Sequence, residues 1–275
     1  MRVRFWGVRG SIAVSGPRYA ATGGCTSCVE VEHDGFRLVL DGGTGLRALG
    51  ESLGQDPVKL AVLFSHYHWD HIQGVPFFTP AFNPLSDITL AGPRSSDGQG
   101  VRELLAHQMQ APTFPIGLET LVGARRFLDV EPGGSATFGP FRVTSAHLPH
   151  PNGVVAFRIE ANGLSVVYAT DNEHGLGGQI HQGLIDLARD TDLLIHDAQY
   201  HAEEYEGKRG PSRRGWGHST WQEAVAAARQ AGAMRLALYH HDPTRDDAAL
   251  GEIEAAAQSL FADSFAAREG QTLKL

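Results

Sequence analysis

The stretch Ser65-His66-Tyr67-His68-Trp69-Asp70-His71 directly follows an apolar run, Leu60-Ala61-Val62-Leu63-Phe64. The run is short, continuous and apolar, which predicts a buried strand. His66 and His68 are two residues apart, so in an extended segment both side chains point to the same side. Asp70 and His71 follow as the chain turns, and we expect them to face a second point beside the first.

This loop predicts a metal site. Its three imidazoles and one carboxylate suit zinc, manganese or iron, because they are borderline-hard ligands. Surface histidines at a strand end are the alternative interpretation, but H-x-H-x-D-H directly after a buried strand is rare by chance. We therefore expect two divalent metal ions, with zinc favoured and manganese or iron as alternatives.

Length and composition favour one folded domain. The chain has 275 residues, of which 42% are hydrophobic and 20% charged, enough for one large core or two small ones. Residues 77–132 are rich in proline and lack the apolar mass for a core of their own. We interpret 1–275 as a single domain, with an insertion at about 77–132 that walls the site.

The net charge and the N-terminal sequence indicate which partners the protein can bind and where in the cell it is expected. A formal charge of −8 argues against a broad nucleic-acid-binding face, which needs clustered Lys and Arg. The start Met1–Trp6 lacks the apolar core of a signal peptide, and no apolar run approaches a membrane span. We expect a cytoplasmic protein with no membrane contact.

The two cysteines, Cys25 and Cys28, form a C-x-x-C pair. A redox pair or half of a zinc site is conceivable. No second pair is present to complete a four-cysteine zinc site, so reduced structural thiols are favoured.

The order of the expected elements indicates an α+β layered domain with two sheets and outer helices. Strand-like runs dominate the first two thirds, with hairpin signals at Asp34-Gly35 and Asn162-Gly163. Helices alternate with strands towards the end. The expected strands are 2–6, 28–33, 36–40, 60–64, 88–91, 125–130, 141–146, 154–160, 165–169, 192–195 and 235–239. The expected helices are 46–53, 101–110, 180–188, 221–230 and 246–260.

Four polar residues share a position at or beside the end of an apolar strand: His150, Asp171, His196 and His240. In layered α/β proteins, binding sites are built at that edge. A single strand-end histidine is more often structural. Because the His66–His71 loop also follows an apolar strand, we expect these residues and the loop to form one site.

The loop Ser65–His71 resembles the signature of the metallo-β-lactamase superfamily. Within it, the resemblance is to the phosphodiesterase branch that includes tRNase Z and PhnP-type cyclic phosphodiesterases. The spacing to Arg158 selects His150 over His147 as the histidine of the third motif. Further segments similar to the branch follow in order: Tyr168–Asp171, Leu194–Ala198, Gly217–Thr220 and Leu236–His240. The resemblance covers nearly the whole chain and implies an αββα four-layer sandwich with two central mixed sheets and outer helices.

The resemblance also implies a set of metal ligands. One metal would be held by His66, His68 and His150, the other by Asp70, His71 and His240, and Asp171 would bridge the two. Asp41, in a turn that the family places beneath the metals, would orient a ligand histidine. Capping a glycine-rich turn is its alternative role.

Two divalent ions of this kind can generate hydroxide at neutral pH and clamp the oxygens of a phosphodiester. We expect a bridging hydroxide to attack phosphorus in line, with Asp70 or Asp171 aligning it. The resemblance places His218 as the proton donor to the leaving alkoxide. His218 precedes the N-cap of an expected helix, so the helix N-terminus should lower its pKa slightly. The alternative for His218 is an exposed loop histidine.

A small or cyclic phosphodiester is the favoured substrate. A tRNase Z-like ribonuclease is less favoured, because the chain lacks a Gly/Lys-rich arm and its charge has the wrong sign for RNA. Trp69, Trp216 and Trp221 are close in sequence to site candidates and could stack on a base or sugar, although core packing is the commoner fate of a tryptophan.

Two other classes stay open: a hydrolase of lactones, thioesters or β-lactams on the same metal site, and a non-catalytic metal-binding protein. A homodimer is an expectation by analogy with the family. The sequence assigns no role to His196, His241 or the loop 203–214. For its basic part, Lys208–Arg214, a solvated loop is the default, and a basic lip in which Arg213 and Arg214 guide phosphate towards His218 is a hypothesis.

Overall fold

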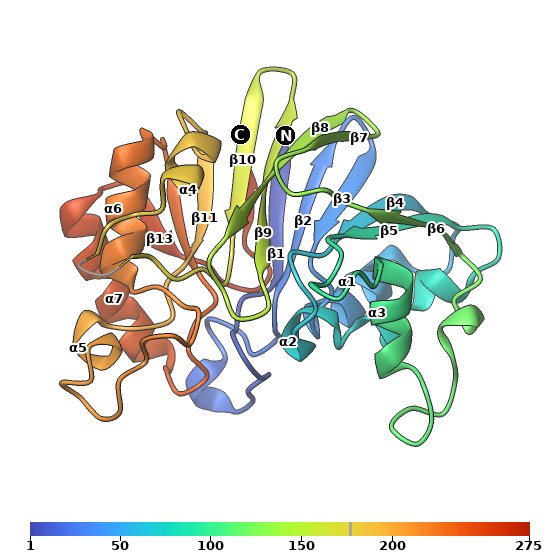
Figure 1. Ribbon diagram of the computed structural model, residues 1–275, viewed down its shortest axis with the longest axis horizontal. Coiled ribbons are helices and arrows are strands. Elements are labelled where there is room, and N and C mark those ends of the chain that lie inside the picture. The colour runs from blue at the N-terminus through green and yellow to red at the C-terminus, as the bar shows by residue number, and fades with distance from the viewer. Residues whose placement is uncertain (176–177) are drawn as a thin grey trace.

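Two β-sheets stacked face to face form the centre of the molecule, and helices cover their outer faces (Figure 1). The structure is a computed structural model that describes residues 1–175 and 178–275. The four layers confirm the predicted α+β class and the αββα sandwich with two mixed sheets.

The first sheet, within the described residues, has seven strands. In spatial order they are β14 (Thr272–Lys274), β1 (Arg2–Gly7), β2 (Cys28–His33), β3 (Phe36–Leu40), β4 (Lys59–Leu63), β5 (Asp87–Gly92) and β6 (Ala124–Asp129). The strands from β14 to β3 pair antiparallel, and those from β3 to β6 pair parallel. The segment 77–132, predicted as an insertion, thus supplies two strands of this sheet.

The second sheet repeats this arrangement, again with seven strands in the described part of the chain. In spatial order they are β13 (Ser264–Ala266), β12 (Leu236–Tyr239), β11 (Leu193–Asp197), β10 (Leu164–Ala169), β9 (Val154–Ala161), β8 (Phe141–Leu148) and β7 (Ser135–Phe138). The strands from β7 to β10 pair antiparallel and those from β10 to β13 pair parallel.

Helices fill the outer layers. On the first sheet lie α1 (Gly45–Leu53) and α3 (Val101–Gln108), and on the second lie α4 (Gln182–Leu187), α6 (Trp221–Ala231) and α7 (Asp247–Leu260) (Figure 1). Two four-residue helices, α2 (Trp69–Ile72) and α5 (Ala202–Tyr205), sit in loops. A capping box begins α6: Thr220 Oγ1 accepts from the Glu223 N–H, and the Glu223 carboxylate accepts from the Thr220 N–H. Across the described residues, no helix has the length and apolar character needed to cross a bilayer.

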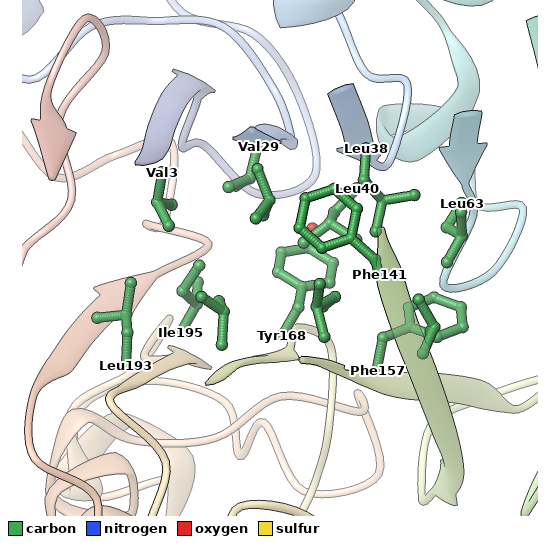
Figure 2. Packing of buried hydrophobic residues seen from close by; sticks show 14 of the residues in the cluster. Val3, Val29, Leu38, Leu40, Leu63, Phe141, Phe157, Tyr168, Leu193 and Ile195 are labelled. Atoms are coloured by element: carbon green, nitrogen blue, oxygen red, sulfur yellow. The ribbon is translucent and has the colours of Figure 1, made fainter. Parts of the chain in front are cut away.

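The main core lies between the two sheets. Side chains alternate along each strand, so every second residue points inward. Figure 2 shows Val3, Val29, Leu38, Leu40 and Leu63 of the first sheet facing Phe141, Phe157, Tyr168, Leu193 and Ile195 of the second. The intervening residues face the helices, which is why these strands read as continuous apolar runs.

Several short elements escaped the sequence analysis. The strands β7, β13 and β14 and the helix α5 were not expected, and the helix expected at 180–188 is confined to 182–187. Elements of three or four residues carry too little periodicity to be recognised. Their positions follow from pairing with longer neighbours, as when β14 pairs with β1.

The parallel pairing brings polar residues to one edge of the sandwich. Asp41 follows β3, His66 follows β4, Asp171 follows β10 and His240 follows β12. Because parallel strands end on the same side, these residues converge although up to 199 positions separate them.

Truncating the inter-sheet core tests this packing. Phe157 is fully buried between the sheets, so Phe157→Ala should lower the free energy of unfolding by about 3–5 kcal/mol through lost burial and a cavity. Phe77→Ala removes the same atoms from a side chain that is 51% exposed and should cost clearly less. Urea denaturation followed by circular dichroism measures both, and equal losses would contradict this description of the core.

Candidate metal centre

The histidine loop has the two-sided geometry expected from its spacing. His68 is extended, with φ −61° and ψ 151°, and acts as the N-cap of α2, which carries Asp70 and His71. The change from extended chain to helical turn separates the two pairs of side chains. The His66 and His68 rings lie 4.5 Å apart between centroids.

The structure brings together all seven residues predicted as ligands. They form two groups whose nitrogen and oxygen atoms lie within 4.8 Å of one another. The first group is His66, His68, His150 and Asp171, and the second is Asp70, His71, Asp171 and His240. Asp171 belongs to both groups.

The contacts within each group have the spacing of a metal coordination shell. In the first, His150 Nε2 lies 3.0 Å from His68 Nδ1 and 3.8 Å from Asp171 Oδ2. In the second, His240 Nε2 lies 3.2 Å from His71 Nε2 and 3.1 Å from Asp171 Oδ1. Ligand atoms held at about 2.1 Å from a zinc ion at tetrahedral angles are about 3.4 Å apart. The two groups therefore fit two divalent cations, with one oxygen of Asp171 turned to each.

His66 gives independent support for a cation at this position. Its Nδ1 donates to Ser65 Oγ at 3.0 Å, which leaves the lone pair on Nε2. His66 Nε2 is buried and has no hydrogen-bond partner among residues 1–175 and 178–275. Burial also lowers the pKa of His66 and lowers that of His150 to about 4. Both rings are thus neutral at pH 7, the form that binds metal.

In the second group, the carboxylates and imidazoles stabilise each other's charged forms. Although burial opposes ionisation, the facing His71 and His240 rings hold the pKa of Asp70 well below its usual range. Burial likewise opposes protonation of His71, but the carboxylates of Asp171, Asp70 and Asp41 raise its pKa. Such strong coupling among buried groups is typical of functional sites.

Asp41 orients the histidines from beneath. Its Oδ2 accepts from His71 Nδ1 at 2.7 Å, from Ser65 Oγ at 2.8 Å and from the Tyr168 hydroxyl at 2.8 Å. Its Oδ1 accepts from the Ser65 N–H at 2.7 Å. Through Ser65 the carboxylate also fixes His66. The predicted contact of Asp41 with a site histidine is confirmed. Among the described residues its carboxylate bonds to Ser65, His71 and Tyr168, and not to the glycine-rich turn that was its alternative partner.

The other ring nitrogens also have fixed partners. His150 Nδ1 donates to the Gly217 carbonyl at 2.8 Å, and His240 Nδ1 donates to Gln199 Oε1 at 3.0 Å. The Ser11 N–H donates to Asp70 Oδ2 at 2.8 Å. Such partners select the tautomer that turns the remaining nitrogen to a metal.

Three residues of the site have strained backbones. Asp41, Asp171 and His240 have φ values of 61°, 47° and 57°, in the left-handed region that non-glycine residues seldom adopt. Asp41 and His240 directly follow β3 and β12, and Asp171 lies two residues after β10, so the left-handed residue turns the chain sharply at each strand end. Strain of this kind clusters at functional sites, where the surrounding structure holds it in place.

His218 lies beside the second group, but its electrostatic setting differs from the prediction. Its Nδ1 donates to Asp197 Oδ2 at 2.7 Å and lies 3.9 Å from Asp171 Oδ2. Although burial opposes protonation, Asp197 and then Asp171 raise the pKa of His218 to about 9. The expectation that the helix N-terminus lowers this pKa is wrong, because a buried carboxylate in direct contact has the larger effect.

The hydrogen-bond partners of the site histidines were not predicted from the sequence. Asp197 was seen only as part of the Leu194–Ala198 segment, and Gln199 and Tyr168 were given no role. The available signal was Asp197 at the end of an apolar strand, the same position that singled out His196.

His196 and His241 belong to the surrounding structure. His196 Nε2 lies 3.2 Å from His174 Nε2, and His241 Nε2 donates to the Ala267 carbonyl at 2.9 Å. Neither is in the ligand groups of the described residues. Of the two histidines near the third motif, His150 joins the site, whereas His147 lies on the wall of a neighbouring cavity.

That cavity, of about 390 Å³, opens beside His66 and His68. Residues 93–96 and Leu104, from the segment predicted to wall the site, form one side. Tyr67, Val154 and Val155 add apolar surface, and Asn152 adds an amide. The cavity has room for a small organic group.

An αββα sandwich with this ligand cluster at its strand ends defines a hydrolase of the metallo-β-lactamase fold. Residues 37–241 match the family described as "Beta-lactamase superfamily domain", and the chain belongs to this family. Metallo-hydrolases of this kind use divalent metal ions, in agreement with the His and Asp groups described above.

Similar proteins place the chain near the predicted branch. It is 27% identical over 238 residues to "Probable metallo-hydrolase YhfI" of Bacillus subtilis (strain 168), covering 84% of this chain and 88% of that protein. It is 24% identical over 305 residues to "Ribonuclease Z" of Haloarcula marismortui, covering 95% and 92%. The crystal structure of "a New Diphosphatase from the PhnP Family" matches with a TM-score of 0.72 and 17% identity, covering 100% and 97%. The resemblance to the tRNase Z and PhnP branch is confirmed.

Neutralising Asp41 tests how the site is oriented. Asp41→Asn replaces one acceptor oxygen by an amide that faces the donors of His71, Ser65 and Tyr168. We expect affinity for zinc to fall about 10–100-fold, as for other losses of a ligand's hydrogen-bond partner. Competition with a fluorescent chelator measures this change. Asp56→Asn, at an exposed position, is the matched control, and a folded Asp41→Asn protein with normal affinity would contradict the orienting role.

Proposed function

We propose that this hydrolase cleaves a small phosphodiester with two divalent metal ions. One ion would be held by His66, His68 and His150, the other by Asp70, His71 and His240, with Asp171 between them. This assignment is supported by the coordination-like spacing and by the buried His66 Nε2, which has no hydrogen-bond partner in the described part of the chain. Zinc is favoured for sites of histidine and carboxylate, with manganese and iron as alternatives.

Bound divalent ions supply a nucleophile from water at neutral pH and neutralise charge on phosphate oxygens. The protein's own groups then orient the reactants. The Ser11 N–H and the imidazoles around Asp70 and Asp171 keep both carboxylates ionised and fixed. Both carboxylates are therefore placed to accept a hydrogen bond from an attacking water.

The His218–Asp197 pair is the main observation in favour of a phosphodiester substrate. An alkoxide leaving a phosphodiester needs a proton, and a positioned histidine can supply one. Asp197 occupies Nδ1 of His218 at 2.7 Å, so Nε2 is the nitrogen available to substrate. Asp197 also accepts from the Gln199 and Ser219 N–H groups, which fix the carboxylate in turn.

The surroundings favour a small substrate. The cavity beside His66 is mostly apolar and of limited volume. Trp69 and Trp216 are 67% and 52% exposed and adjoin the histidine loop and the His218 segment in sequence, so both are available to stack on a base or sugar. Trp221, by contrast, is the first residue of α6 and is buried in the apolar cluster between the second sheet and its helices.

Similarity to Ribonuclease Z keeps a tRNase Z-like activity as the second candidate. The absence of a Gly/Lys-rich arm in the sequence, together with the net charge of −8, makes it the weaker one. Hydrolysis of a lactone or thioester on the same ions is the alternative for carbonyl chemistry. A homodimer and a cytoplasmic location stay predictions.

Hydrolysis of bis(p-nitrophenyl) phosphate tests the proposal. Metal-stripped protein reloaded with zinc or manganese should show metal-dependent turnover. For a phosphodiester whose leaving group is an alkoxide, such as a 2′,3′-cyclic nucleotide, His218→Ala should lower kcat by about 10²–10⁴-fold, because it removes the proton donor. Bis(p-nitrophenyl) phosphate should be affected far less, because p-nitrophenolate leaves without a proton. Metal content should hold, since His218 is outside the proposed ligand set.

Two further variants sharpen the test. Asp197→Asn should lower kcat and shift its pH profile, whereas His107→Ala removes an exposed histidine on α3 and should change nothing. Full activity of His218→Ala on the substrate with the alkoxide leaving group would contradict the proton-donor role. If the wild-type protein binds two metals but hydrolyses only a lactone or thioester panel, the phosphodiesterase proposal is wrong.

A further inference from the structure

The loop from Glu206 to Gly217 joins α5 to the His218 segment and is tied to the metal centre. Glu173 accepts from the Gly215 and Gly217 N–H groups at 2.7 and 2.8 Å and from the Tyr205 hydroxyl at 2.6 Å. The Gly217 carbonyl accepts from His150 Nδ1 at 2.8 Å. A Cβ at Gly217 would lie 2.1 Å from that ring nitrogen, so the loop and the site histidine are in direct contact.

Most charges around this loop neutralise one another. Glu203 lies 3.5 Å from Arg209, and Glu206 forms an ion pair with Lys208. Glu204 forms an ion pair with Arg245, outside the loop. The acidic run thus provides counter-ions for Lys208 and Arg209.

Arg213 and Arg214 are the exceptions: in the described ranges 1–175 and 178–275 neither side chain forms an ion pair or a hydrogen bond. Of the two, Arg213 is half-buried, whereas Arg214 is exposed, as are Lys208 and Arg209. A cation that is partly desolvated and lacks a counter-ion costs stability unless a ligand supplies one.

Two aromatic rings lie against this cation, and one of them also packs on the ring of the catalytic candidate His218. The guanidinium carbon lies 4.4 Å from the centre of the Trp216 ring and 5.9 Å from that of Tyr200. The Tyr200 ring in turn lies 5.9 Å from the ring of His218. Stacking on rings restrains the plane of a guanidinium and leaves its edge free to donate in a fork. Arg214 lies over Tyr205 instead.

We propose that Arg213 binds a second phosphate group of the substrate, separate from the phosphodiester that is cleaved. A phosphate suits a free guanidinium edge, because two parallel N–H groups match two of its oxygens. The preferred substrates would be phosphodiesters that also carry a phosphomonoester. This inference rests on the proposed phosphodiesterase function and narrows its substrate class.

A pair of substrates that differ by one phosphate tests this inference. Thymidine 5′-(p-nitrophenyl phosphate) is compared with the same ester carrying a 3′-phosphate, and the ratio of their kcat/KM values is measured. The wild-type protein should prefer the 3′-phosphate form. Arg213→Ala should reduce that preference about 10–100-fold, the typical range for a charge-assisted hydrogen bond, mainly through KM. Arg213→Lys should keep part of it.

Arg209→Ala is the matched control, because it removes the same charge from the same loop at a position paired with Glu203. It should leave the preference intact. If Arg213→Ala slows both esters equally, Arg213 only supports the loop and the inference is wrong. A wild-type protein that does not discriminate between the two esters would also overturn it.

A binding measurement separates failure of this inference from failure of the proposed function. If neither ester is hydrolysed, the phosphodiesterase proposal is wrong, but calorimetry with thymidine 3′,5′-bisphosphate and thymidine 5′-monophosphate still reports on Arg213. Tighter binding of the bisphosphate that is lost in Arg213→Ala and kept in Arg209→Ala would support the second phosphate site. Equal affinity of the wild-type protein for both nucleotides would overturn it.

Discussion

The buried carboxylate of Asp41 is the interaction on which the site depends. It accepts hydrogen bonds from Ser65 after β4, from His71 on α2 and from Tyr168 on β10. These donors come from both sheets, so one side chain links the sheet edges where the ligands converge. A fully buried carboxylate is tolerable only when its oxygens are hydrogen-bonded, and here they are. The same bonds turn the free nitrogens of His66 and His71 towards the cluster.

The cluster above Asp41 is a second constraint. The carboxylates of Asp70, Asp171 and Asp197 are all buried near six buried or half-buried imidazoles. Packing so many polar groups together opposes folding unless charges and hydrogen bonds compensate. The apolar core between the sheets supplies the rigidity that holds them. Left-handed backbones at Asp41, Asp171 and His240 show the same trade-off between local strain and a fixed geometry.

Long elements were predictable because their periodicity is local. The runs that became β3, β4, β9 and β10, and the helices α6 and α7, carry strong apolar patterns and clear turn or capping signals. The short strands β13 and β14 could not be found in this way, because partners more than 20 residues distant decide whether they form. The pKa of His218 was misjudged for a related reason: Asp197, 21 residues away, outweighs the nearby helix N-terminus.

The sequence alone determined which residues can bind metal, since H-x-H-x-D-H after a buried strand is a local pattern of ligand types. It also indicated the layered fold, because apolar runs and turn residues are encoded locally. Only the tertiary structure decided which distant groups meet: Asp171 between the two ligand groups, Asp197 on His218, and Arg213 against Tyr200 and Trp216. The physical reason is that strand pairing and sheet packing, not spacing along the chain, set the distances over which charges and hydrogen bonds act.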